Sequence, residues 1–169
     1  MDVTTALWIF PILFMLHNFE EIIMLQPWWR RNRINPPNSP FTRLAAYPPE
    51  TVAALIAGIF LLFSLITVLS ITSNQIIFGI GLALAFGLQL VGHIVEFLRL
   101  RRYMPHIVTA VFTLPYYPWL FFMATQSGYS VNSIVLATIG MGVVGLIILW
   151  SAHASSGYIT NWLKTKQHK

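Results

Sequence analysis

The chain has 169 residues, of which 56% are hydrophobic and only 9% are charged, and its mean hydropathy is +0.68. Soluble domains carry about 25% charged residues, so this composition excludes a soluble globular enzyme and indicates an integral membrane protein. The sequence contains no cysteine, which excludes disulfides, thiolate metal sites and a cysteine nucleophile.

Five apolar segments follow one another along the chain, and each is long enough to cross a bilayer as a helix. We expect these spans at about residues 5–26, 51–71, 74–98, 105–125 and 131–160. No basic residue precedes the first apolar run, so we expect that run to stay as a span and not to be removed as a signal peptide. The sequence therefore predicts an all-α polytopic bundle of five transmembrane helices, forming one domain over residues 1–169.

The basic residues predict how the chain crosses the membrane. All ten lie on one side of the five-span arrangement, in the first connection, in the third connection and after the fifth span. They are Arg30, Arg31, Arg33, Arg43, Arg99, Arg101, Arg102, Lys164, Lys166 and Lys169. By the positive-inside rule this side faces the cytoplasm, which places the N-terminus outside and the C-terminus inside. The chain is thus predicted to be a multi-pass protein of a bacterial or archaeal cell membrane, and the basic residues give no indication of nucleic-acid binding.

The longest connection, at about residues 27–50, combines membrane-interface and turn-forming residues. Trp28 and Trp29 are typical of the headgroup layer, and the prolines from Pro36 to Pro40 disfavour a regular helix. This interfacial loop could form a flap over the cytoplasmic mouth of the bundle, or it could be a solvated linker with aromatic anchors.

Two sequence features concern the shape and packing of the helices. Pro115 and Pro118 predict a kink in the fourth segment, which could open a cavity to lipid. Glycines in the third segment, including Gly81 and Gly87, favour close contact between helices.

The pentapeptide His17-Asn18-Phe19-Glu20-Glu21 lies inside the first apolar segment. A carboxylate in hydrocarbon is costly unless it is protonated, paired with a cation or bound to a metal. Residues three and four apart share a helix face, so His17 clusters with both carboxylates. His93 and Glu96 form a second pair of this kind in the third segment.

Imidazole and carboxylate groups on facing helices are ligands for zinc, iron or manganese. We expect a divalent metal, with zinc as the first choice, and Glu20 as the general base beside His17 at the catalytic centre. The candidate metal ligands, or their direct partners, are His17, Glu21, His93, Glu96 and His153.

Each of these residues also has a purely structural explanation. The first cluster could be a metal-free polar group with protonated carboxyls, and Glu96 could simply pair with Arg99 one turn later. His153 could pack among small neighbours, and His106 could be a polar residue at a helix start, so His106 is not placed among the ligands.

Four histidines are predicted to lie in the cytoplasmic half of the bilayer, close to the carboxylates. The hypothesis that follows is a metal-dependent membrane hydrolase acting on a lipid or another amphiphile from the inner leaflet. The alternatives are a metal-free acid–base enzyme such as an isomerase, a proton-coupled transporter, and a small helper or binding subunit.

The pentapeptide resembles the signature of the HXXEE-motif family of small bacterial and archaeal membrane proteins. Two further motifs are similar: a second His-x-x-Glu at His93–Glu96, and a Pro-Gly-x-x-Thr stretch at Pro105–Thr109, where His106 replaces the usual glycine. The resemblance covers most of the chain. It implies an architecture and candidate residues, and no particular reaction.

Overall fold

The structure is a computed structural model that describes residues 2–32 and 47–167, and the described part contains helices and no strand. Five helical stretches in it are long and apolar enough to cross a membrane, with α5 and α6 together making the fourth. This confirms the prediction of an all-helical fold with five helical segments long and apolar enough to span a membrane. The helices are α1 (Val3–Asn32), α3 (Pro49–Thr72), α4 (Ile76–Leu100), α5 (Ile107–Thr113), α6 (Tyr116–Gln126) and α7 (Val131–Gln167).

Two helices extend beyond the spans that the sequence predicted. α1 continues through Pro27 to Asn32, so the expected interfacial loop at 27–50 begins with helix, and residues 33–46 of that loop lie outside the described part of the chain. The indole N–H of Trp28 donates a 2.7 Å hydrogen bond to the carbonyl of Tyr103, which ties down the last turns of α1. α7 extends beyond residue 160 and, at about 55 Å, is much longer than a bilayer core of about 30 Å.

The fourth span is broken where its prolines predicted a kink. α5 ends at Thr113, and α6 starts at Tyr116 directly after Pro115. Proline lacks the N–H that a continuous helix would need at this point. The hydroxyl of Tyr116 donates a 3.0 Å hydrogen bond to the carbonyl of Ala6, which fastens α6 to the start of α1.

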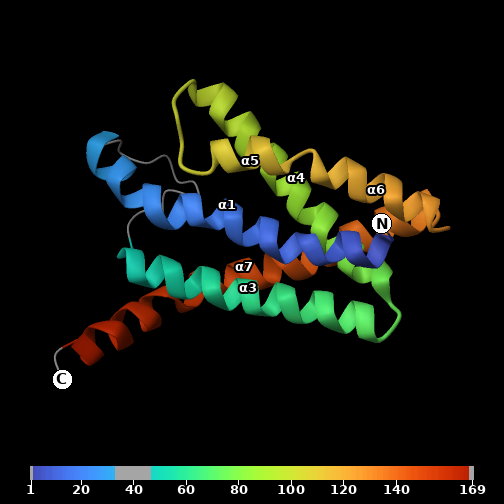
Figure 1. Cartoon of the computed structure of the whole chain (residues 1–169). Helices are drawn as coiled ribbons and strands as arrows, with labels where there is room; N and C mark the ends of the chain where they lie inside the picture. The colour runs from blue at the N-terminus through green and yellow to red at the C-terminus, as the bar shows by residue number, and fades with distance from the viewer. Residues whose placement is uncertain (1, 33–46, 168–169) are drawn as a thin grey trace.

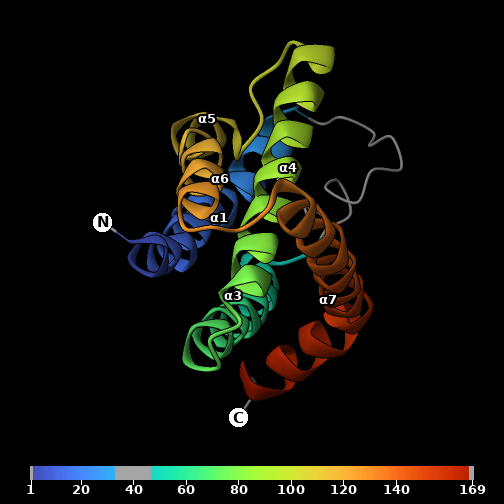
Figure 2. The same ribbon diagram turned by 90° about the vertical axis from the view of Figure 1, so that its right-hand side faces the viewer.

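Helix α4 forms the centre of the bundle, because it contacts each of the other described helices. α1 and α3 run side by side, α5 and α6 cover α1 and α4, and α7 packs along another side of α4 (Figures 1 and 2). This arrangement brings α1, α4 and the segment around α5 together, and all of the candidate groups except His153 come from these elements.

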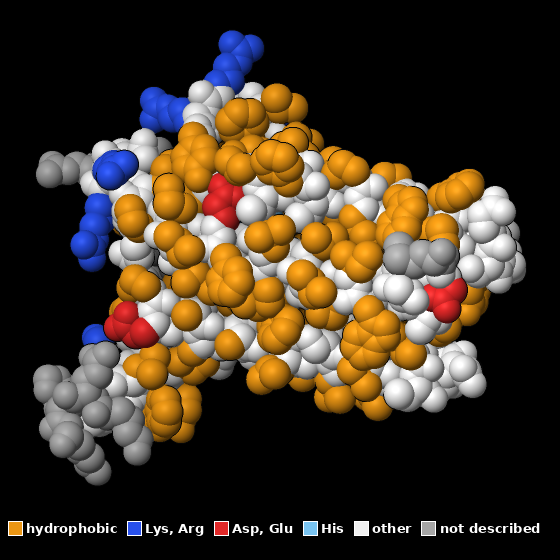
Figure 3. Space-filling model, in the orientation of Figure 1, with side chains coloured by type: hydrophobic (Ala, Val, Ile, Leu, Met, Phe, Trp, Pro, Cys, Tyr) orange, Lys and Arg blue, Asp and Glu red, His pale blue; other side chains and the backbone are white. Residues whose placement is uncertain are grey.

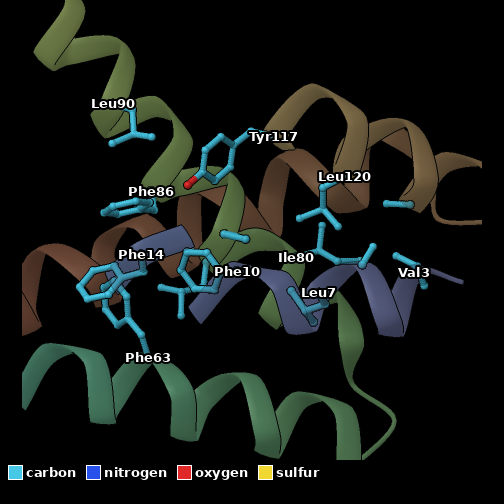
Figure 4. Packing of buried hydrophobic residues seen from close by; sticks show 14 of the residues in the cluster. Val3, Leu7, Phe10, Phe14, Phe63, Ile80, Phe86, Leu90, Tyr117 and Leu120 are labelled. Atoms are coloured by element: carbon cyan, nitrogen blue, oxygen red, sulfur yellow. The ribbon is translucent and has the colours of Figure 1, made fainter. Parts of the chain in front are cut away.

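The core includes a cluster of phenylalanines from α1, α3 and α4, surrounded by aliphatic side chains (Figure 4). The ring centroid of Phe14 lies 5.2 Å from that of Phe63 and 5.1 Å from that of Phe86. The ring centroids of Phe10 and Phe86 are 5.9 Å apart. Aromatic pairs of this kind each contribute about 0.5–1.5 kcal/mol beyond the burial of their area. His17 lies one turn beyond Phe14, and its ring centroid is 5.7 Å from that of Phe86, so the candidate site adjoins this aromatic cluster.

Glycines allow α4 to approach its neighbours closely. A Cβ atom at Gly81 would lie 2.5 Å from the carbonyl oxygen of Ala137 in α7, and one at Gly87 would lie 2.6 Å from the ring of Tyr117 in α6. These contacts confirm the predicted packing role of the two glycines.

The outer surface fits a membrane environment. Large apolar side chains are exposed along the helices, and they cover the flank of the molecule seen in Figure 3. Lys and Arg side chains gather at one end in the same view, the end where α1 and α4 finish with Arg30, Arg31 and Arg99.

Candidate functional site

Helix α1 carries part of the site on its buried stripe. Phe14, His17, Glu21 and Leu25 follow one another at intervals of three or four residues, so they share one face, and all four are buried. His17 is 1% exposed and Glu21 is 8% exposed. Glu20 precedes Glu21 by one residue and is therefore rotated about 100° from it around the helix axis. It is half-buried and faces the segment that leads into α5.

The Glu20 carboxylate is held by three hydrogen bonds from that segment. Oε2 accepts hydrogen bonds from the Thr109 backbone N–H at 2.8 Å and from the Thr109 hydroxyl at 2.6 Å, and Oε1 accepts one from the Tyr103 hydroxyl at 2.9 Å. Partial burial and the hydrogen bond to Glu20 raise the pKa of Tyr103 to about 12, so Tyr103 remains a donor at neutral pH. Both oxygens of Glu20 are therefore already engaged.

Thr109 also connects Glu20 to His17. Its Oγ1 lies 3.2 Å from Nδ1 of His17, and the much shorter contact with Glu20 takes the hydroxyl proton. The threonine oxygen therefore accepts a hydrogen bond from Nδ1–H. This leaves the lone pair of His17 on Nε2, which is how a hydrogen bond to one ring nitrogen fixes a histidine as a base or a metal ligand through the other.

Helix α4 brings His93 to the same place. The rings of His17 and His93 are stacked with centroids 5.6 Å apart. Potential ligand atoms of His17, Glu21 and His93 all lie within 4.8 Å of one another. The structure thus brings together three residues that the sequence predicted as a site, on two different helices.

His106 is a member of this cluster that the sequence analysis did not include among the ligands. It is 0% exposed, its Nδ1 lies 3.5 Å from Oε1 of Glu21, and its ring centroid is 4.1 Å from that of His93. Burial lowers the pKa of His106 to about 4, and the charge of Glu20 opposes this shift. The residue is therefore a neutral imidazole in the folded protein.

The backbone at His106 is in an unusual conformation, with φ 118° and ψ −16°. Residues other than glycine rarely adopt such backbone angles, and the strain costs about 1–3 kcal/mol. The conformation turns the chain between Pro105 and Ile107, where the short helix α5 begins. The positive φ also explains why a glycine would suit this position of the Pro105–Thr109 stretch.

Glu96 and His153 lie at the edges of the cluster. Ligand atoms of His93, Glu96 and His106 form a second group within 4.8 Å, and Glu96 itself is half-buried. Among the described residues no ion pair joins Glu96 to Arg99, which was its structural alternative. His153 belongs to neither group, but it lines the same cavity as His17 and Glu21.

That cavity has a volume of about 600 Å³ and lies between α1, α3, α4 and α7. Most of its lining is apolar, including Phe14, Phe63, Leu82 and Met141. The polar side chains on its wall are His17, Asn18, Glu21, Gln89, Thr138 and His153. The volume falls within the roughly 300–1,000 Å³ of small-molecule sites.

The donor set fits a transition metal. The donor atoms of one zinc ion lie about 3–4 Å apart, because each bond is about 2.1 Å long, so a group within 4.8 Å has the size that one ion needs. Imidazole nitrogens with one carboxylate suit zinc, iron or manganese and disfavour magnesium or calcium, which take oxygen ligands.

Comparisons with known proteins give a family and no activity. The family described as a protein of unknown function with HXXEE motif matches residues 8–120, which include Glu20 and all of the candidate metal ligands except His153. No curated protein and no solved structure matches the chain.

Proposed function

We propose that this chain, which belongs to the HXXEE-motif family of proteins of unknown function, is a membrane-embedded metal-dependent hydrolase of a lipid or another amphiphile. The observation that carries the proposal is the meeting of His17, Glu21 and His93 beside an apolar cavity. A divalent ion there would offset the charge that makes a buried carboxylate costly.

The proposed roles follow from what each side chain contacts. His17, Glu21 and His93 would hold the ion, and zinc is the first choice among the metals that this donor set suits. When bound, such an ion supplies a metal-activated water as nucleophile at neutral pH. Glu96 is half-buried near His93 and would act as a partner of that ligand.

The two carboxylates of the motif face different neighbours, and we assign them different roles. Glu21 lines the cavity, whereas Glu20 is bonded through both oxygens to Thr109 and Tyr103. The contacts therefore favour Glu20 as a positioning residue over its expected role as general base. His153, which also lines the cavity, is the candidate for carrying a proton between water and the leaving group.

The cavity supports an amphiphilic substrate. Apolar side chains such as Phe63 and Leu82 would hold an alkyl chain, while the ester or amide group would lie at the end formed by His17 and Glu21. If the basic end of the bundle faces the cytoplasm, as the positive-inside rule indicates, a substrate would enter from the inner leaflet of the cell membrane.

The first experiment is metal analysis of detergent-purified protein, prepared without chelators, by mass spectrometry. We expect about one zinc, iron or manganese ion per chain, and its loss in His17→Ala. A matched control is Gln89→Ala, which alters a polar residue of the cavity wall outside the cluster and should leave the metal in place.

A metal-bearing preparation would then be screened against lipid esters and amides, with Glu21→Gln as the inactive variant. Absence of metal from the wild-type protein would overturn the metal-dependent hydrolase.

One contact favours a second candidate, a proton-carrying or acid–base function without metal. Oε1 of Glu21 lies 3.5 Å from Nδ1 of His106, and the His106 ring packs against His93. Such a row of titratable groups could relay a proton. Proton flux into liposomes that hold metal-free protein, abolished by Glu21→Gln, would support this function, and metal-dependent turnover without flux would rule it out.

A further inference from the structure

His106 combines a strained backbone with complete burial of its side chain. Its φ of 118° lies in the region that glycine adopts freely and other residues avoid, and its imidazole is 0% exposed. Such a conformation persists only where the surroundings determine it strongly, and it is concentrated at functional sites. The strain alone does not say what the ring does, but the neighbours of the ring do.

The imidazole of His106 connects the two groups of candidate ligands. Its Nδ1 is 3.5 Å from the carboxylate of Glu21, which belongs to the first group. Its ring centroid is 4.1 Å from that of His93, which belongs to both groups. The centroid of His17 is 6.3 Å away. The four side chains do not form a single group within 4.8 Å, so one ion held by the first group would gain His106 as a ligand by a shift of its adjacent ring toward the ion.

We propose that His106 is a further metal ligand, so that the ion is held by three imidazoles, from His17, His93 and His106, and by the carboxylate of Glu21. This inference rests on the proposed metal site and extends it by one ligand from a third element, the loop before α5. Three histidines and one carboxylate favour zinc or iron(II) over the harder manganese. Tyr103 and Thr109 lie on either side of His106 and both bond to Glu20, so the first glutamate of the motif positions the loop that delivers the third imidazole.

The backbone conformation makes an unusually clean test possible. His106→Gly removes the imidazole and also relieves the backbone strain of the positive φ, which offsets part of the cost of the space left by the ring and of the greater freedom of glycine in the unfolded chain. Asn74→Gly is the matched control. Asn74 also has a positive φ, of 56°, but it lies in the turn between α3 and α4, away from the cluster. Glycine there relieves the same kind of strain without touching the site.

The measurement is titration of metal-free, detergent-purified protein with Co²⁺, followed by the visible spectrum of the bound ion and by its affinity. We expect His106→Gly to bind Co²⁺ at least about tenfold more weakly than wild type, with an altered spectrum, and Asn74→Gly to match wild type. Free imidazole added to His106→Gly should restore part of the spectrum by filling the space left by the ring.

Thermal unfolding of the metal-free proteins checks that both variants are folded. If His106→Gly were unfolded, His106→Asn would replace it, because asparagine tolerates positive φ. Equal Co²⁺ affinity and an unchanged spectrum in the folded His106 variant would overturn the inference and leave the three-residue site standing. No Co²⁺ binding by the wild-type protein would instead overturn the proposed metal site together with this extension.

Discussion

Thr109 binds Glu20 twice, because its backbone N–H and its hydroxyl both donate to the same carboxylate oxygen, at 2.8 and 2.6 Å. The two residues are 89 positions apart in the chain. This pair of bonds joins the HXXEE helix to the loop that carries His106, and the threonine oxygen also orients His17. Glu20, the first glutamate of the motif, and the threonine of the Pro105–Thr109 stretch therefore form one structural unit.

Removing the Thr109 hydroxyl should loosen this unit. Thr109→Val keeps the shape of the side chain but leaves Glu20 with one donor fewer in a partly buried place, and we expect a loss of about 1–3 kcal/mol in the free energy of unfolding. Thermal unfolding in detergent measures the change. Thr109→Ser retains the hydroxyl and should lose much less. A Thr109→Val protein as stable as Thr109→Ser would contradict the role given to this bond.

The three glutamates of the cluster should differ in their effect on metal binding. Glu21→Gln removes a proposed ligand and should abolish binding, whereas Glu96→Gln should weaken it by no more than about 10–100-fold, as changes to partners of ligands do. Glu20→Gln should reduce stability and affinity together, because it disturbs the bonds to Thr109 and Tyr103. Isothermal titration with Zn²⁺ tests this order. A stronger loss in Glu96→Gln than in Glu21→Gln would exchange the roles of those two residues.

Tyr103 should ionise only at strongly alkaline pH while the protein is folded. Its folded-state pKa of about 12 lies above the ordinary 10, so the folded state holds the proton more tightly than the unfolded state does. The stabilisation is complete below pH 10 and disappears as the pH rises toward 12. The phenolate absorbance of wild type minus that of Tyr103→Phe isolates this residue. The same difference taken in a Glu20→Gln background should titrate at lower pH, and no such shift would mean that Glu20 does not act on Tyr103.

The close contact between α4 and α7 should be sensitive to a single methyl group. Gly81→Ala places a Cβ against the backbone carbonyl of Ala137, which cannot move aside without shifting α7, so we expect a destabilisation of about 1–3 kcal/mol. Gly92→Ala is the matched control on the same helix, since nothing lies within 4 Å of its added Cβ, and it should be neutral or slightly stabilising. Equal effects of both substitutions on thermal unfolding would show that this helix contact contributes little to stability.

The natural absence of cysteine allows a direct test of topology. Leu100→Cys at the end of α4 and Ser127→Cys after α6 lie at opposite ends of the bundle, and both side chains are exposed. A membrane-impermeant thiol reagent should label Ser127→Cys in intact cells and Leu100→Cys only in inverted vesicles. The reverse pattern would place the basic end outside.

The sequence predicted the five spans, the break at Pro115 and the meeting of His17, Glu21 and His93, because these depend on hydropathy, proline chemistry and helical spacing. The rest depends on how a loop folds against a helix. Periodicity placed Glu20 and Glu21 on either side of His17 but could not say which one faces the cavity.

The site residues that sequence reasoning did not find lie in the loop before α5 and in the first turn of α5. Tyr103, His106 and Thr109 reach the cluster through the positive φ at His106, and a local sequence pattern does not encode that conformation for a histidine. The one available signal was the Pro105–Thr109 stretch, whose usual glycine points to a special backbone conformation.

The partners of Glu20 also set the order of events while the protein is being made. α1 emerges first, yet Tyr103 and Thr109 come 83 and 89 residues later. At about 5–20 residues per second, the ribosome needs roughly 4–18 seconds to supply them. Throughout that interval Glu20 lacks its hydrogen bonds to Tyr103 and Thr109, and Glu21 lacks its contact with His106, so both carboxylates in the new helix are without their final partners. Glu20 therefore gains its partners only when residues 103–109 dock, and a chain truncated before them should be a target for membrane quality control.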